Sequence, residues 1–183
     1  MHPAAEAALD LQIGELKQIF NAMDPAPFRE RDLDPNAEAY IVDWAREVDR
    51  RAPLALEVQL AHEAVTDESR TLLNDAVHTY FRERAASTRR ELRRLFRRGR
   101  VSLVIGLAFA GTAILAGEFL AGFTSEERYK IVITETFVIG GWVALREPIQ
   151  IFLYDWWPIR GTAKLYDRLA TMRVAVTGAG GAA

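Results

Sequence analysis

An apolar run from Val101 to Phe123 constrains the fold of this chain more than any other feature. The run contains a single charged side chain, that of Glu118. A helix rises about 1.5 Å per residue, so a helix of this length covers roughly 34 Å, and the hydrocarbon core of a bilayer is about 30 Å thick. The sequence therefore predicts a transmembrane helix over residues 101–123.

A second apolar run begins at Tyr129 and continues to Leu145. We expect it to form a second transmembrane helix over residues 129–147. A short polar segment, residues 124–128, separates the two runs and is expected to form an external loop. The two runs together predict a transmembrane helical hairpin.

The cytoplasmic end of the second span is marked by charge, proline and aromatic side chains. Pro148 is expected to end or kink the helix, because proline cannot donate the backbone hydrogen bond. Residues 148–160 are rich in aromatic side chains, which favour the headgroup level of a membrane. The sequence leaves open whether this segment lies along the interface or continues the span. The expected interfacial residues are Arg146, Glu147, Trp156 and Trp157.

Charge is distributed unevenly along the chain. Residues 1–80 carry 16 acidic and 7 basic side chains, whereas residues 81–100 carry 2 acidic and 9 basic ones. Lysine and arginine concentrate on the cytoplasmic flanks of membrane spans. The start of the chain also lacks the pattern of a signal peptide. We therefore expect a bacterial inner-membrane protein with both termini in the cytoplasm, an acidic head over residues 1–80 and a cytosolic tail over residues 161–183.

Within the acidic head, the hydrophobic pattern predicts a small α/β domain. Alternation over residues 8–15 and 54–61 indicates two strands, and Asp34-Pro35 is a typical helix start. The helix between them should bury Ala37, Tyr40, Ile41, Trp44, Ala45 and Val48. No proline or glycine interrupts residues 66–98, so we expect one long helix that continues into the first span. The predicted fold is an α+β membrane protein, in which a small βαβα cytosolic domain precedes a two-helix transmembrane hairpin.

A basic helical collar is predicted over residues 81–100. Six arginines repeat at i+4 in two adjacent rows, and they are Arg89, Arg90, Arg93, Arg94, Arg97 and Arg98. Such a face is attracted to anionic headgroups by roughly 1 kcal/mol per residue. The collar is either a topology determinant alone or a binding site for anionic lipids or an acidic partner. We expect no nucleic-acid partner, because aromatic residues do not alternate with the arginines of the collar and the rest of the chain is not basic.

Two further patterns lie inside the predicted spans. Small residues at helical spacing permit close helix approach, either within the chain or between copies, and they are Gly106, Ala110, Ala113, Gly117 and Ala121. Glu118 and Glu135 are acids at a similar depth below the outer surface. They could share a proton or bind a cation, or each could reach the outer interface or a neighbouring hydroxyl or lysine.

No pattern in the sequence indicates catalysis. The chain has no cysteine, and its histidines lack the spacing of a metal site. We therefore expect no catalytic residues, no metal, no cofactor and no enzymatic activity. The sequence favours a membrane-anchored structural or interaction protein that self-assembles or docks onto a larger complex through its head. The alternative is a homo-oligomeric channel or ion-translocating subunit that uses Glu118 and Glu135.

Three stretches carry a resemblance to a known family. They cover residues 20–47, 76–100 and 144–159, with the sequences FNAMDPAPFRERDLDPNAEAYIVDWARE, AVHTYFRERAASTRRELRRLFRRGR and ALREPIQIFLYDWWPI. The chain resembles a family of small bacterial two-span inner-membrane proteins. The resemblance implies this location and domain order, and it implies no activity and no site residues.

Overall fold

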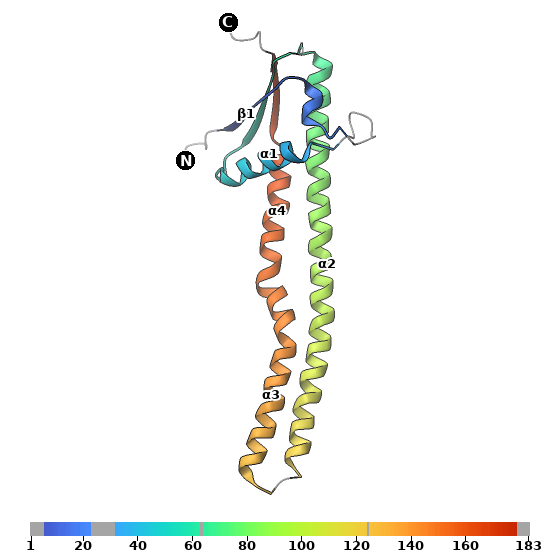
Figure 1. Cartoon of the computed structure of the whole chain (residues 1–183), viewed down its shortest axis with the longest axis vertical. Coiled ribbons are helices and arrows are strands. Elements are labelled where there is room, and N and C mark those ends of the chain that lie inside the picture. The colour runs from blue at the N-terminus through green and yellow to red at the C-terminus, as the bar shows by residue number, and fades with distance from the viewer. Residues whose placement is uncertain (1–5, 23–31, 63, 124, 179–183) are drawn as a thin grey trace. The chain divides into compact units, whose positions relative to one another are not determined.

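The computed structural model describes residues 6–22, 32–62, 64–123 and 125–178, and it is a mixed α/β structure (Figure 1). The chain divides into two compact units. We call residues 1–88 together with 161–183 the head, and residues 89–160 the helical unit. The proline-containing segment 23–31, for which the sequence predicts a stiff loop because proline fixes φ, lies outside the described residues.

A three-stranded parallel sheet forms the head. Its strands are β1 (Ala7–Ile13), β2 (Leu54–Leu60) and β3 (Arg173–Gly178), and β2 lies in the centre (Figure 1). Leu56 of β2 is paired with Leu9 on one side and Val174 on the other. The two strands predicted from alternation are thus present. Their parallel pairing follows from the helical crossover between them.

Helices cover one face of this sheet. After β1, the short helix η1 (Leu16–Ile19) brings Ile19 and Phe20 into the core. The next helix, α1 (Pro35–Glu47), begins as predicted: the Asp34 carboxylate accepts a hydrogen bond from the Asn36 amide at 2.9 Å.

The predicted buried stripe of α1 was wrong at one position. Tyr40 is 55% exposed, whereas Val42, which the prediction omitted, is buried. These two residues flank Ile41, the residue at the centre of the buried face. The core lies on the side of Val42, and the tyrosine keeps its hydroxyl group in solvent.

The long helix is α2 (Asp67–Ala121), which is continuous as predicted. Thr66 starts it, because its hydroxyl oxygen accepts a hydrogen bond from the Ser69 amide at 3.1 Å. In the head, α2 buries Leu73, Val77 and Phe81. Gly99, the first glycine of this helix, does not interrupt it.

The head is larger than residues 1–80, because the chain returns to it. Beyond residue 160, helix α4 (Trp156–Leu169) and strand β3 contribute to the same core, in which Leu169, Met172 and Val176 are buried. The Phe81 and Tyr166 rings stack with centroids 6.1 Å apart. Residues 161–178 are therefore part of the head and do not form a separate tail.

In the helical unit, α3 (Glu127–Gln150) is followed by the π-helix η2 (Ile151–Asp155) and then by α4. Pro148 lies inside α3, so of the two outcomes expected at this residue, an end or a kink, the helix does not end. The chain stays helical, and the irregularity caused by the proline appears as the π-helical turn just after it. Residues 148–160 thus continue the helix.

Candidate functional site

Small residues line the contact between α2 and α3. A Cβ atom added to Gly106 would lie 2.9 Å from the Ala144 carbonyl oxygen. One added to Gly117 would lie 2.9 Å from the Phe137 Cβ. The five small residues noted in the sequence are all buried in the chain. Gly106, Ala110 and Gly117 contact α3 directly, so in the structure these three serve packing within the chain.

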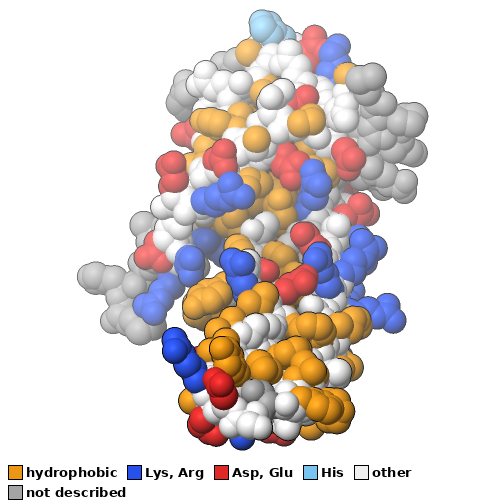
Figure 2. Space-filling view, turned by 60° about the horizontal axis from the view of Figure 1, so that its bottom comes forward, with side chains coloured by type: hydrophobic (Ala, Val, Ile, Leu, Met, Phe, Trp, Pro, Cys, Tyr) orange, Lys and Arg blue, Asp and Glu red, His pale blue; other side chains and the backbone are white. Residues whose placement is uncertain are grey.

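The outer faces of both helices are apolar and exposed. On α2 they carry Val104, Ile105, Phe109, Leu115 and Phe119, and on α3 they carry Ile131, Ile139, Trp142 and Val143. Figure 2 shows hydrophobic side chains gathered on the surface at one end of the molecule. A contiguous apolar surface of this kind is typical of a membrane or a protein interface.

Among the described residues, α2 is the helix that is long and apolar enough to cross a membrane. Most of its apolar segment is exposed. In α3, by contrast, charged side chains interrupt the apolar sequence, and only residues 136–145 lie between Glu135 and Arg146. Among the described residues, the apolar segment of α2 thus meets the length and composition expected of a membrane span, whereas α3 does not.

The two acids of these segments do not meet. Glu118 and Glu135 are both exposed, and in the described part of the chain neither forms a hydrogen bond or an ion pair. The neighbours considered as partners are otherwise engaged. The Thr112 and Thr136 hydroxyls donate to backbone carbonyls of their own helices, and Lys130 pairs with Glu127 at 3.5 Å. A proton shared between the two carboxylates is therefore not supported within one chain.

A polar and aromatic cluster lies between α2 and the end of α3. An Arg98 guanidinium nitrogen lies 2.7 Å from a Glu147 carboxylate oxygen. The Phe96 ring lies 6.1 Å from that of Phe152 and 6.3 Å from that of Trp156.

Among the described residues, neither Arg146 nor Glu147 forms an ion pair with Asp155 or Arg160. Glu147 pairs with Arg98 of α2, and the Arg160 guanidinium lies over the Trp156 ring at 5.6 Å. Sequence reasoning assigned Arg98 to a lipid-facing row because nothing in the sequence sets the register of α2 against α3. The register places Gly99 against Ile151 and so brings Arg98 next to Glu147.

The remaining arginines of the collar are exposed, and they are Arg89, Arg90, Arg93, Arg94 and Arg97. The apolar residues Leu92, Leu95 and Phe96 are half-buried, as expected for the opposite face. The collar is therefore amphipathic, with these arginines on its exposed face.

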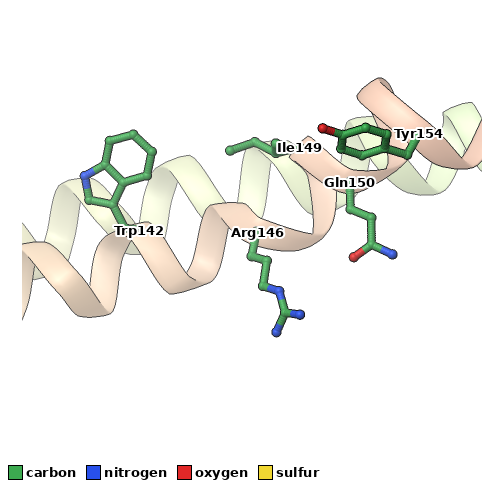
Figure 3. A pocket seen from close by; sticks show the side chains of 5 residues that line it. All are labelled: Trp142, Arg146, Ile149, Gln150 and Tyr154. Atoms are coloured by element: carbon green, nitrogen blue, oxygen red, sulfur yellow. The ribbon is translucent and has the colours of Figure 1, made fainter.

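An open hollow on the outer side of α3 contains Arg146. It is lined by Trp142, Arg146, Ile149, Gln150 and Tyr154 (Figure 3). Arg146 and Gln150 project from the same side of the helix (Figure 3). In the described residues Arg146 has no ion-pair partner. A second hollow shares Arg146 and Gln150 but also contains the carboxylates of Glu147 and Asp155.

In the head, the most strongly coupled charged group is formed by Glu38, Tyr80 and Arg84. The Tyr80 hydroxyl donates to a Glu38 carboxylate oxygen at 2.6 Å, and the Arg84 guanidinium donates to the same oxygen. Burial, followed by the hydrogen bond to Glu38, raises the pKa of Tyr80. Burial alone would lower the pKa of Arg84, but its hydrogen bonds to Glu38 and Tyr80 outweigh this effect and raise it. The group links α1 to α2 and contains no activated nucleophile.

His62 and His78, the histidines that the structure describes, have no metal-site geometry around them. His78 Nε2 lies 2.8 Å from the Met172 carbonyl oxygen, so this ring connects α2 to the turn before β3. His62 is exposed. Over the described ranges there is no group of three or more side chains that could hold a metal ion.

Comparisons with protein-family models, curated proteins and solved structures give no match to this chain.

Proposed function

We propose that the chain is a membrane-anchored interaction protein with two spans, whose cytosolic head is the docking module. The parallel pairing of β2 with β3 carries this proposal. The apolar segment of α2 lies between these two strands in the sequence. If that segment crosses a membrane, the chain must cross back before residue 173, because β3 joins the same sheet as β2.

This requirement makes α3 the second span despite its charges. It follows the apolar segment of α2 directly, contacts it at Gly106 and Gly117, and has an exposed apolar outer face. Most of its charged residues lie near its two ends, where side chains can reach the headgroups, and Glu135 is the one that lies deeper in the helix. The fold thus supports an even number of crossings, with the head on one side.

The docking role is supported by the uncovered face of the head sheet. Asp10 and Glu57 are paired in register on this face, and Gln12 and Gln59 follow them. Arg173 lies within 3.2 Å of Glu57 and also contacts Glu6. A polar surface with paired charges is typical of a recognition surface.

Cysteine labelling tests the topology directly, because the chain has no native cysteine. Ser125→Cys, between the two helices, should react with a membrane-impermeant maleimide added outside intact cells. Ser69→Cys, at the start of α2 in the head, should react only after the membrane is permeabilised. Labelling of both positions in intact cells, or extraction of the protein by alkaline carbonate, would contradict the proposal.

The docking role needs a separate measurement. Affinity purification after mild detergent extraction should yield the protein in a discrete assembly, with itself or with a larger complex. Replacing Glu57 by Lys should reduce this association while leaving membrane integration intact. A strictly monomeric, partner-free protein under these conditions would refute the docking role and leave the two-span topology unaffected.

A further inference from the structure

We propose that the hollow beside Arg146 binds the headgroup of an anionic phospholipid, a phosphodiester without a compensating ammonium group. The inference rests on the proposed two-span topology, which places the end of α3 at the cytoplasmic headgroup level. It assigns a site that is separate from the collar arginines of α2.

Charge selects the ligand class. Arg146 is exposed and, over the described residues, has no counterion, whereas the nearby Arg98 is neutralised by Glu147. A guanidinium offers paired donors that match phosphate oxygens. Gln150, one helical turn later, projects to the same side and adds an amide donor (Figure 3). Arg146 and Gln150 thus present two donors on one side of the helix, where a single anionic group could contact both (Figure 3).

The surroundings favour a lipid over a free ion. Trp142, Ile149 and Tyr154 complete the hollow and are all exposed apolar or aromatic side chains. Aromatic rings of this kind favour the boundary between headgroup and acyl chain. The neighbouring hollow contains Glu147 and Asp155, which would repel a phosphate. The headgroup therefore belongs on the Trp142 side of Arg146, where the lining has no carboxylate.

Native mass spectrometry of the full chain, released from nanodiscs that contain equal amounts of phosphatidylglycerol and phosphatidylcholine, tests the site. The wild type should retain phosphatidylglycerol preferentially. Arg146→Gln should reduce that preference about tenfold, the size expected for the loss of a charge-assisted hydrogen bond. Arg128→Gln, at the other end of α3, makes the same change in charge outside the hollow and should retain the preference.

Three results would overturn the proposal. The first is equal retention of the two lipids by the wild type. The second is an equal loss of the preference in Arg146→Gln and Arg128→Gln. The third is displacement of the lipid by millimolar inorganic phosphate, which would indicate a site for the free ion. Should Arg146→Gln fail to insert, Arg146→Lys keeps the charge but lacks the forked donor, and it should lose part of the preference. Carbonate extraction of each variant separates failure of this site from failure of the two-span topology.

Discussion

Gly117 shows how closely a single residue controls the helical unit. A Cβ atom at this position would lie 2.9 Å from the Phe137 Cβ, whereas nothing lies within 4 Å of one at Gly111. Gly117→Leu should therefore lower the free energy of unfolding by about 1–3 kcal/mol, the usual cost of overpacking. Gly111→Leu should have little effect. Unfolding of both variants in mixed micelles checks this, and equal stability would contradict the packing.

Tyr80 gives the head a dependence on alkaline pH. Its folded-state pKa is raised by burial and by the hydrogen bond to Glu38, above the value of about 10 expected in the unfolded chain. The folded state therefore holds the proton where the unfolded state releases it. The stabilisation is fully present below about pH 10 and is lost as pH rises further.

Tyr80→Phe removes both the hydrogen bond and this titration. Below pH 10 the variant should be less stable than the wild type by about 1 kcal/mol. The difference between the two should shrink as pH rises from 10 toward 11. Hydrogen exchange of head peptides measures it, and the exposed Tyr40→Phe serves as the control. A difference that grows with pH would contradict the assignment.

Residue-level predictions succeeded where the partner is local in sequence. The Asp34 cap and the Thr66 cap depend on neighbours two or three residues away, and both are present. The partner of Glu147 is Arg98, which lies in another helix, and sequence reasoning did not find it. Only the register between α2 and α3 brings these two side chains together.

At the scale of the helices, the contact between α2 and α3 can be fixed covalently. The Cβ of Ala110 lies 3.3 Å from the ideal Cβ position at Gly141, close to the roughly 3.8 Å typical of disulfides. The double variant Ala110→Cys/Gly141→Cys should therefore oxidise to a bridge within one chain. The pair Gly111→Cys/Gly140→Cys, with open space at both positions, should not form one.

Gel mobility under non-reducing conditions distinguishes the possible outcomes. A faster monomer band is expected for the Ala110/Gly141 pair. A covalent dimer from this pair would assign the small residues to contacts between copies, which is the alternative that the sequence left open.

Elements with strong local patterns were predictable. The strands over residues 7–13 and 54–60 follow from alternation, and α2 follows from the lack of helix-breaking residues. Pro148 was expected to end or kink its helix, and the chain stays helical there, with a π-helical turn just after the proline. Helix propensity alone does not decide whether the helix ends at Pro148 or continues, because the packing of α3 against α2 also stabilises the helix.

At the scale of the whole molecule, β3 determines whether the head is complete. Val176 of β3 is buried and pairs with Val58. Val176→Asp should bury an unpaired charge and destabilise the head by on the order of 3 kcal/mol. Thr177→Asp, the adjacent exposed position, should be tolerated. Limited proteolysis of the head should show the difference, and similar resistance of both variants would contradict the role of β3.

The joining of residues 161–178 to the head was only partly predictable. The alternation of TMRVAV suggested a strand, but nothing in the sequence specified which strand it would pair with. Parallel pairing with β2 depends on contacts such as Phe81 with Tyr166 and Arg168 with the Ala52 carbonyl, which join segments far apart in the chain. Such non-local contacts leave no periodic signal.

The order of the strands also has a consequence for biosynthesis. The central strand β2 emerges from the ribosome before residues 101–147, and its partner β3 emerges after them. One edge of β2 must therefore stay unpaired while residues 101–147 are being synthesised. A chaperone that shields exposed strand edges should be needed during that interval, and a stalled nascent chain that stops short of residue 173 should aggregate or be degraded by proteases.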